Sequence, residues 1–401
     1  LILALPPLDL LPFAFLALVP LALSISELPP GHGGRRHAAI LGASFGLVFW
    51  GWSLIWVPFV VGSRFAWAVP GYLLQLALLA SLSALFAWVA HGLHKGAALP
   101  LGLALPLAWV GVEWVKGHFP FGLAFPWLGL GLSLSGWPEL LGLAEWVGEG
   151  GVAFWLAAVA GLVATAFRPV STGRRIGPWI LAFSVALVPA VVGVLRAETL
   201  SLSDGPRVLV VGTDILPALR EDPSRTWEVS LTQTQEALTG APPGPWDLVL
   251  LPEGAIPFAV GSSEWEGSVD SVRVLGKEAQ GPFVVGTFGG SRDGGPDGPT
   301  NSAILVSPDD PVIQRYDKVR LVPGMETGAY IPGPGTRLFS VGGREYGPLI
   351  CYESLYSDMA RRARNSGAVA LLNLTSDVWF GGDDSPMGSF FLPQHPAHLV
   401  L

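Results

Sequence analysis

Three residues of complementary chemistry each follow a strand-like stretch of this chain. Cys351, the only cysteine, ends the apolar run 347–351, Glu253 lies within 251–257, and Lys318 lies within 316–323. A thiol can attack a carbonyl carbon, a carboxylate can carry its proton, and an ammonium group can stabilise the resulting oxyanion. The three residue types together predict acyl transfer through a cysteine thioester.

Each of these residues would be weak evidence alone. A single buried cysteine usually behaves as a small hydrophobic side chain, and a single Glu or Lys is usually solvated. Their joint occurrence at strand ends favours the catalytic interpretation, because strand ends in α/β domains are where catalytic side chains gather.

The second half of the chain alternates strand-like and helix-like segments, which predicts an α/β layered domain. No GxGxxG, P-loop or metal-ligand spacing of His and Cys is present. We therefore predict neither a cofactor nor a metal, and we assign no metal role to His395 and His398. The predicted strands are 207–211, 248–251, 283–287, 302–306, 349–352 and 368–373, and the predicted helices are 222–239, 264–279 and 355–366.

The first half has the composition of a membrane domain. Hydrophobic residues make up 50% of the 401 residues and charged residues only 13%, against about 25% charged in soluble domains. We predict a transmembrane helical domain over 1–197 and a catalytic domain over 206–401. The predicted spans are 8–26, 38–60, 67–90, 97–115, 150–167 and 177–195, each near the roughly 20 residues that cross a bilayer.

The charges of the connecting segments predict an orientation. Alternate connections carry Arg35, Arg36, Lys95, Arg168, Arg174 and Arg175, whereas the intervening ones carry Arg64 and Lys116. The positive-inside rule puts the first set in the cytoplasm and the domain after 197 on the far side. The net charge of −8, with no basic stripe, argues against a nucleic-acid partner.

The stretch 119–131, between two predicted spans, is too rich in Pro and Gly for a helix and too apolar for a solvated loop. One interpretation is a re-entrant turn packed among helices. The other is an entry surface for acyl chains at the level of the lipid headgroups.

The chain resembles the bacterial apolipoprotein N-acyltransferase family, the membrane-bound branch of the nitrilase (carbon–nitrogen hydrolase) superfamily. The resemblance spans the chain and implies a membrane helical bundle joined to a nitrilase-like αββα sandwich, here expected to be truncated at its C-terminus. The segments that carry it are 6–9, 113–114, 122–128, 251–257, 301–303, 315–323, 350–353 and 377–381.

The resemblance implies a role for each site residue. Glu253 would be the general base, Lys318 the oxyanion stabiliser and Cys351 the nucleophile. Glu326 and Glu353 would be supporting carboxylates, for which a structural hydrogen-bonding role is an equal alternative. The pocket or substrate entry would be formed by Tyr352 together with Phe125, Pro126, Trp127, Trp379 and Phe380.

The implied reaction moves an acyl chain from a membrane phospholipid to Cys351, and then to the α-amine of the diacylglyceryl-cysteine of an apolipoprotein. A monomer in the bacterial inner membrane, with its catalytic domain on the periplasmic side, is expected. The segment Pro323-Gly324-Met325-Glu326-Thr327 replaces the usual Pro-Phe-Gly-Glu-aromatic sequence of the family, and Ser376 stands where Asn is common. The alternatives are a membrane-anchored amidohydrolase, or an inactive protein that binds lipid or lipoprotein. A transporter lacks support, because the spans show no repeat.

Overall fold

The computed structural model describes two compact units of the chain. The described residues are 1–62, 67–120, 123–168, 176–201, 204–213, 222–290, 298–380 and 386–398. One unit comprises Leu1–Leu202 together with Asp383–Leu401, and the other comprises Ser203–Gly382. Each unit is considered by itself.

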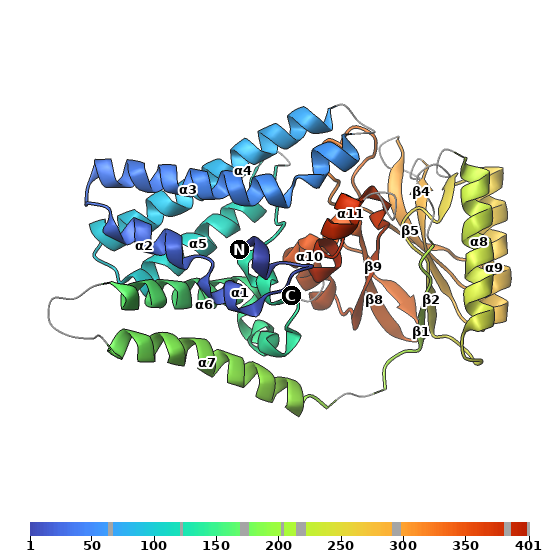
Figure 1. Ribbon diagram of the computed structural model, residues 1–401. Helices are drawn as coiled ribbons and strands as arrows, with labels where there is room; N and C mark the ends of the chain where they lie inside the picture. The colour runs from blue at the N-terminus through green and yellow to red at the C-terminus, as the bar shows by residue number, and fades with distance from the viewer. Residues whose placement is uncertain are drawn as a thin grey trace. The chain divides into compact units, whose positions relative to one another are not determined.

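The first unit is helical (Figure 1). Three of its helical segments are long and apolar enough to cross a membrane: Ala68–Gly96, Pro138–Phe167 and Ile176–Thr199. Its principal helices are α1 (Leu11–Leu16), α2 (Val19–Glu27), α3 (His32–Ser53), α4 (Ala68–His91), α5 (Leu101–Gly117), α6 (Ala144–Phe167) and α7 (Ile176–Thr199).

Two predicted spans are broken in the structure. The span expected over 8–26 forms two short helices, and Pro20 lies in the first turn of α2, where a missing N–H is tolerated. The span expected over 38–60 ends as an α-helix at Ser53 and continues as a short π-helical turn over Val57–Val61. Pro58 in that turn lacks the N–H that a continuous helix would use.

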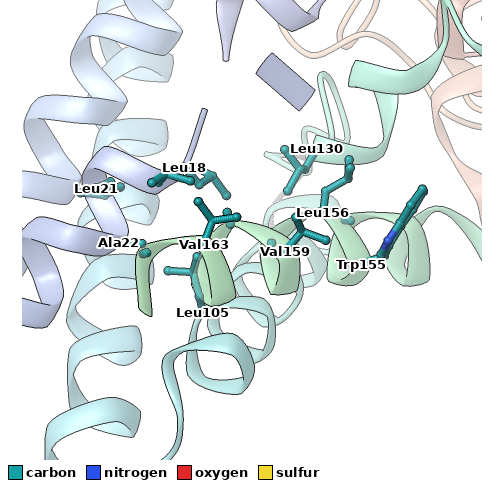
Figure 2. Close-up of a cluster of buried hydrophobic side chains, with 14 of the residues drawn as sticks. Leu18, Leu21, Ala22, Leu105, Leu130, Trp155, Leu156, Val159 and Val163 are labelled. Atoms are coloured by element: carbon teal, nitrogen blue, oxygen red, sulfur yellow. The ribbon is translucent and has the colours of Figure 1, made fainter. Parts of the chain in front are cut away.

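A core of small and branched apolar side chains holds the helical unit together. Figure 2 shows Leu18, between α1 and α2, and Ala22 of α2 on the side of α6 that carries Val163, in the same core as Leu156 and Val159. Close approach of helices also depends on glycine. A Cβ on Gly161 would lie 2.6 Å from the carbonyl oxygen of Leu101, so α5 and α6 meet backbone to backbone.

The stretch between α5 and α6 is irregular up to a 3-10 turn over Leu130–Leu134. Trp127 and Leu128 are buried, and so is the whole of that turn, whereas Leu123 is exposed. These positions fit the packed-turn interpretation for residues 127–131. Phe121 and Gly122 lie outside the described residues, and lipid entry stays a prediction.

Residues 386–398 pack with the helical unit, and the predicted catalytic domain over 206–401 stays a prediction. Helices α11 (Pro386–Phe391) and α12 (Gln394–Ala397) belong to this unit. The imidazole of His398 lies 5.0 Å from the Trp127 ring, and the amide of Gln394 donates to the carbonyl of Pro6 at 3.4 Å.

The second unit contains two β-sheets. The larger has the order β1 (Val208–Val210), β2 (Leu248–Leu250), β4 (Phe283–Gly289), β5 (Thr300–Val306) and β6 (Gln314–Asp317), with β3 (Ile256–Ala259) paired to β4. The strands β1, β2 and β4 run parallel, and β4, β5 and β6 run antiparallel. The smaller sheet has the order β7 (Phe339–Val341), β8 (Arg344–Ile350) and β9 (Ala370–Leu374).

Alternating side chains of the larger sheet build two cores, which gives the αββα sandwich. Phe283 and Val285 face helices α8 (Pro223–Gly240) and α9 (Ser263–Ala279), which cover one side of this sheet in Figure 1. Val284, between them, faces the smaller sheet, where it shares a core with Tyr346. This alternation follows from the two-residue period of a strand. Helix α10 (Ser357–Asn365) packs on β8 and β9 through Ala363.

The predicted segments of this unit agree with the observed ones except near the cysteine. The strand expected over 349–352 ends at Ile350, and Cys351 begins a 3-10 turn over Cys351–Leu355. Strands β3, β6 and β7 were not predicted.

Candidate active site

Each predicted catalytic residue lies within three residues of the end of a strand in the α/β unit. Glu253 comes three residues after β2, Lys318 follows β6, and Cys351 follows β8. The loop of Glu253 is fixed by its backbone, because the N–H of Gly286 donates to the carbonyl of Pro252 at 3.2 Å. Lys318 is fixed in the same way by its N–H, which donates to the carbonyl of Asn301 at 2.8 Å.

Lys318 is bound between two carboxylates. Its Nζ lies 2.9 Å from Oε1 of Glu326 and 3.5 Å from Oε1 of Glu253. The side chain is buried, with 1% of it exposed. Burial alone would lower the pKa of this ammonium group, but the negative charges of Glu253 and Glu326, and of Cys351 once it is ionised, raise it well above its usual value. Lys318 is therefore a permanent cation at any physiological pH.

The charges of Glu253 and Lys318 both act on the sulfur of Cys351. Burial and the negative charge of Glu253 raise the pKa of the Cys351 thiol to about 12, while Lys318 and a hydrogen bond from Thr375 act in the opposite direction. At neutral pH the resting group is thus a thiol, which requires a base when it attacks. The structure brings Glu253, Lys318 and Cys351 into one electrostatically coupled group.

The backbone of Cys351 has an unusual conformation, with φ of 50°. A residue other than glycine in this left-handed region is strained and needs support from its surroundings. Here the Ser354 hydroxyl donates to the Cys351 carbonyl at 2.9 Å, and the N–H of Ile350 donates to Glu353 at 2.8 Å. Cys351 therefore lies on a sharp turn from strand to helix that these hydrogen bonds support.

Glu353 joins the two strand ends that carry the lysine and the cysteine. Its Oε1 accepts the N–H groups of Val319 and Arg320 at 2.6 and 3.0 Å, and its Oε2 accepts that of Ile350. The Tyr316 hydroxyl donates to the same carboxylate at 2.8 Å. These contacts give Glu353 a structural role, whereas Glu326 touches Lys318 directly.

The predicted pocket residues are distributed over the two units. Phe125, Pro126 and Trp127 belong to the helical unit, where Nζ of Lys116 donates to the Trp127 carbonyl at 2.8 Å. Phe380 is buried in the α/β unit, and the side chain of Trp379 is outside the described residues. The ring of Tyr352 packs edge-on against Tyr356 at 5.3 Å. Their roles as pocket residues stay predictions.

Sequence reasoning assigned no role to three further residues that the structure brings to this group. Asn301 donates hydrogen bonds to both Glu253 and Glu326. Thr375 forms a hydrogen bond with Cys351, and Tyr330 lies near both carboxylates. Asn301 carried a signal, since it is a polar residue in a strand that is buried throughout. Among the described residues, no group of three or more His, Cys, Asp or Glu side chains is arranged to hold a metal ion.

Comparisons with known proteins match both halves of the chain. Residues 1–162 match the apolipoprotein N-acyltransferase N-terminal domain, and residues 216–395 match the carbon–nitrogen hydrolase domain. An apolipoprotein N-acyltransferase of Allorhizobium ampelinum is 30% identical over 97% of this chain and 78% of its own length. The enzyme of that name from Geobacter metallireducens is 28% identical over 94% of this chain and 75% of its own length.

Solved structures match part of the chain at lower similarity. A mutant of an amidase of the nitrilase superfamily from Nesterenkonia has a TM-score of 0.35 and 23% identity, and covers 44% of this chain and 67% of its own. A carbon–nitrogen hydrolase from Helicobacter pylori has a TM-score of 0.34 and 20% identity, and covers 42% and 59%. Because a relative of 30% identity aligns over 97% of this chain and 78% of its own length, this chain belongs to the apolipoprotein N-acyltransferase family.

Proposed function

We propose that this protein N-acylates apolipoproteins by a ping-pong reaction in which Cys351 carries the acyl chain. The donor is a membrane phospholipid and the acceptor is the free α-amine of a diacylglyceryl-cysteine. The observation that carries the proposal is the coupling of a half-buried thiol, a carboxylate and a permanent ammonium group in a chain with long apolar helices. Relatives named apolipoprotein N-acyltransferase align with both halves of the chain.

In the first half-reaction, Glu253 takes the thiol proton as the sulfur attacks the ester carbonyl of the phospholipid. The oxyanion of the tetrahedral intermediate is stabilised by the ammonium group of Lys318 and by the backbone N–H of Tyr352. When the C–O bond breaks, Glu253 returns the proton to the leaving oxygen. The products are a thioester on Cys351 and a lysophospholipid.

In the second half-reaction, the α-amine attacks the thioester carbonyl. Glu253 removes a proton from the attacking nitrogen, Lys318 again stabilises the oxyanion, and the C–S bond breaks. The sulfur recovers its proton from Glu253, and an amide is formed. Membrane helices favour this sequence, because two lipid-bearing substrates held at one depth meet at a lower entropic cost.

The runner-up function is amide hydrolysis by a membrane-anchored enzyme, in which water resolves the thioester. The family relationship of the helical half does not favour it, since a soluble nitrilase-type hydrolase has no need of that half. An inactive binding protein is disfavoured because Glu253, Lys318 and Cys351 are all present and coupled.

Mass spectrometry of the purified protein and its products tests the proposal. With phospholipid alone, we expect one acyl group on the wild-type protein and none on C351A. With a diacylated lipopeptide added, we expect a third acyl chain on the peptide nitrogen. Release of free fatty acid without acylated peptide would instead support the hydrolase, and an absence of acyl-enzyme on wild type would support the binding protein. Glu278→Gln, an exposed change in α9, is the matched control for Glu253→Gln.

A further inference from the structure

Asn301 lies at the centre of the carboxylate group described above, on the fully buried strand β5. Its Nδ2 donates to Oε1 of Glu253 at 2.6 Å and to Oε1 of Glu326 at 2.8 Å. An amide nitrogen has two hydrogens, so this one nitrogen can serve both carboxylates at once. The opposite amide orientation would place a carbonyl oxygen against two carboxylate oxygens, which is repulsive.

Lys318 makes the same pair of contacts from its own strand end. Its Nζ also lies against Oε1 of Glu253 and Oε1 of Glu326. The two carboxylate oxygens are therefore bridged twice, once by a charged donor and once by a neutral donor. Charge alone would let Glu253 rotate about Lys318, whereas a second donor with fixed geometry defines which oxygen faces the lysine.

The two oxygens of Glu253 are left in different states by this arrangement. Oε1 accepts from both Asn301 and Lys318. Oε2 is buried and has no hydrogen-bond partner among the described residues. A buried acceptor without a partner carries a desolvation cost, and such a cost is common where a group is kept available for a reaction.

We propose that Asn301 is a positioning residue that locks Glu253 through Oε1, so that Oε2 is the oxygen that receives and returns the proton in both half-reactions. This inference rests on the proposed role of Glu253 as the general base. The amide also keeps Glu253 and Glu326 hydrogen-bonded on the same side of Lys318, which leaves the third ammonium hydrogen for the substrate oxyanion.

The proposal predicts a kinetic defect of a particular kind. In Asn301→Ala and in the isosteric Asn301→Asp, the rate constant for acyl-enzyme formation should fall about 10- to 100-fold, the value of a hydrogen bond to a charged group. The transfer step to lipopeptide should fall by a similar factor, because Glu253 serves both steps. The KM for each substrate should change by less than about 2-fold, because Asn301 is not proposed to bind substrate.

A pH profile separates positioning from simple structural support. Without the amide donor, the anionic Glu253 loses a hydrogen bond, so the acidic limb of kcat/KM should move to higher pH in Asn301→Ala. The added carboxylate of Asn301→Asp should move it further in the same direction. Asn365→Asp makes the same charge change at an exposed position of α10 and should behave as wild type.

Active-site titration keeps the result interpretable if a variant folds poorly. Unfolded protein lowers the amplitude of acyl-enzyme formation, whereas loss of positioning lowers the rate constant of the molecules that react. A reduced amplitude with an unchanged rate constant and an unchanged acidic limb would overturn the inference about Asn301. An absence of acyl-enzyme on wild type would instead overturn the proposed function itself, so the two failures are distinguishable.

Discussion

At the scale of the residue, the central property of this site is that Cys351, the proposed nucleophile, rests as a thiol. Burial and the charge of Glu253 raise the pKa of Cys351 to about 12, although Lys318 partly offsets them. The thioester forms only after the sulfur has been activated, and only then do the α-amine of the acceptor and water compete for it. A thiol that ionises only as it attacks limits side reactions with oxidants and alkylating agents, because the thiolate is the reactive species.

Alkylation of the resting protein tests this storage. At pH 8 only about one thiol in ten thousand is ionised when its pKa is about 12. The alkylation rate of Cys351 by iodoacetamide should therefore rise about tenfold per pH unit from pH 7 to pH 10, with no plateau. Mass spectrometry follows the reaction cleanly, since the chain has one cysteine. A plateau near neutral pH would show a stable thiolate.

The positive charge of Lys318 determines whether its replacement speeds or slows the alkylation of Cys351. Lys318 lowers the pKa of the thiol, so Lys318→Met should raise that pKa and slow alkylation at every pH. Lys277→Met, an exposed change in α9, should leave the alkylation rate unchanged. Faster alkylation in Lys318→Met would mean that the lysine shields the sulfur sterically more than it attracts the thiolate.

At the scale of the element, the site depends on how closely the Glu253 loop crosses strand β4. A Cβ built on Gly286 would lie 2.4 Å from the carbonyl oxygen of Pro252 and 2.5 Å from Cα of Glu253. No side chain fits between these backbones. The hydrogen bond from Gly286 to Pro252 then fixes the height of the loop above the sheet.

Gly286→Ala should therefore displace Glu253 without changing any reactive group. We expect acyl-enzyme formation to fall at least about tenfold, because a shift of about 1 Å in a catalytic group costs much of its effect. Overpacking should also lower the free energy of unfolding by about 1–3 kcal/mol. Kinetics and chemical denaturation measure the two effects.

Gly267→Ala is the matched control for this change. It lies inside helix α9, and a Cβ there meets nothing within 4 Å. It should leave activity unchanged and stabilise the helix by up to about 1 kcal/mol. Full activity in Gly286→Ala would show that the loop has room to move.

Glu253 and Cys351 could be predicted as candidates from the sequence because each follows an apolar stretch, whereas Lys318 follows a polar strand and was a candidate because of its ammonium group and the family resemblance. The strands β3, β6 and β7 could not be predicted, since each of these short segments contains a proline or polar residues, whereas the equally short β1 and β2 are wholly apolar. Strand β6 in particular reads Gln-Arg-Tyr-Asp, which resembles a polar loop. It is a strand because Tyr316 enters the core between the sheets and Asp317 is buried against Arg315 at 2.7 Å.

The positions of Asn301 and Gly286 could not be predicted for a different reason. Both depend on contacts with the loop of Glu253, which is more than 30 residues away in the chain. Periodicity and turn signals report local structure, whereas these contacts are set by the pairing of β4 with β5 and by the crossing of a loop. A polar residue in a buried strand was the only local signal.

At the scale of the whole molecule, the position of Lys116 bears on the predicted orientation in the membrane. We counted Lys116 as a charge of a connecting segment. In the structure it lies in the last turn of α5, buried, with its Nζ 4.9 Å from the centre of the Trp50 ring and bonded to the Trp127 carbonyl. Such a lysine ties the stretch after α5 to its helix and is a poor marker of a solvated connection.

Without Lys116, the charge asymmetry of the connections becomes larger, with Arg64 alone opposing six cationic residues. The larger asymmetry strengthens the prediction, by the positive-inside rule, that the α/β unit lies outside the cytoplasm. Arg64, Arg174 and Arg175 lie outside the described residues, so this count comes from the sequence.

Accessibility of single cysteines tests the orientation directly, because C351A removes the only native thiol. In that background, Ser366→Cys is exposed in the α/β unit and His32→Cys is exposed at the start of α3. A maleimide that cannot cross membranes should label Ser366→Cys in intact spheroplasts and His32→Cys only after permeabilisation. The reverse pattern would place Cys351 on the cytoplasmic side, away from exported acceptors, and the positive-inside argument would be wrong for this chain.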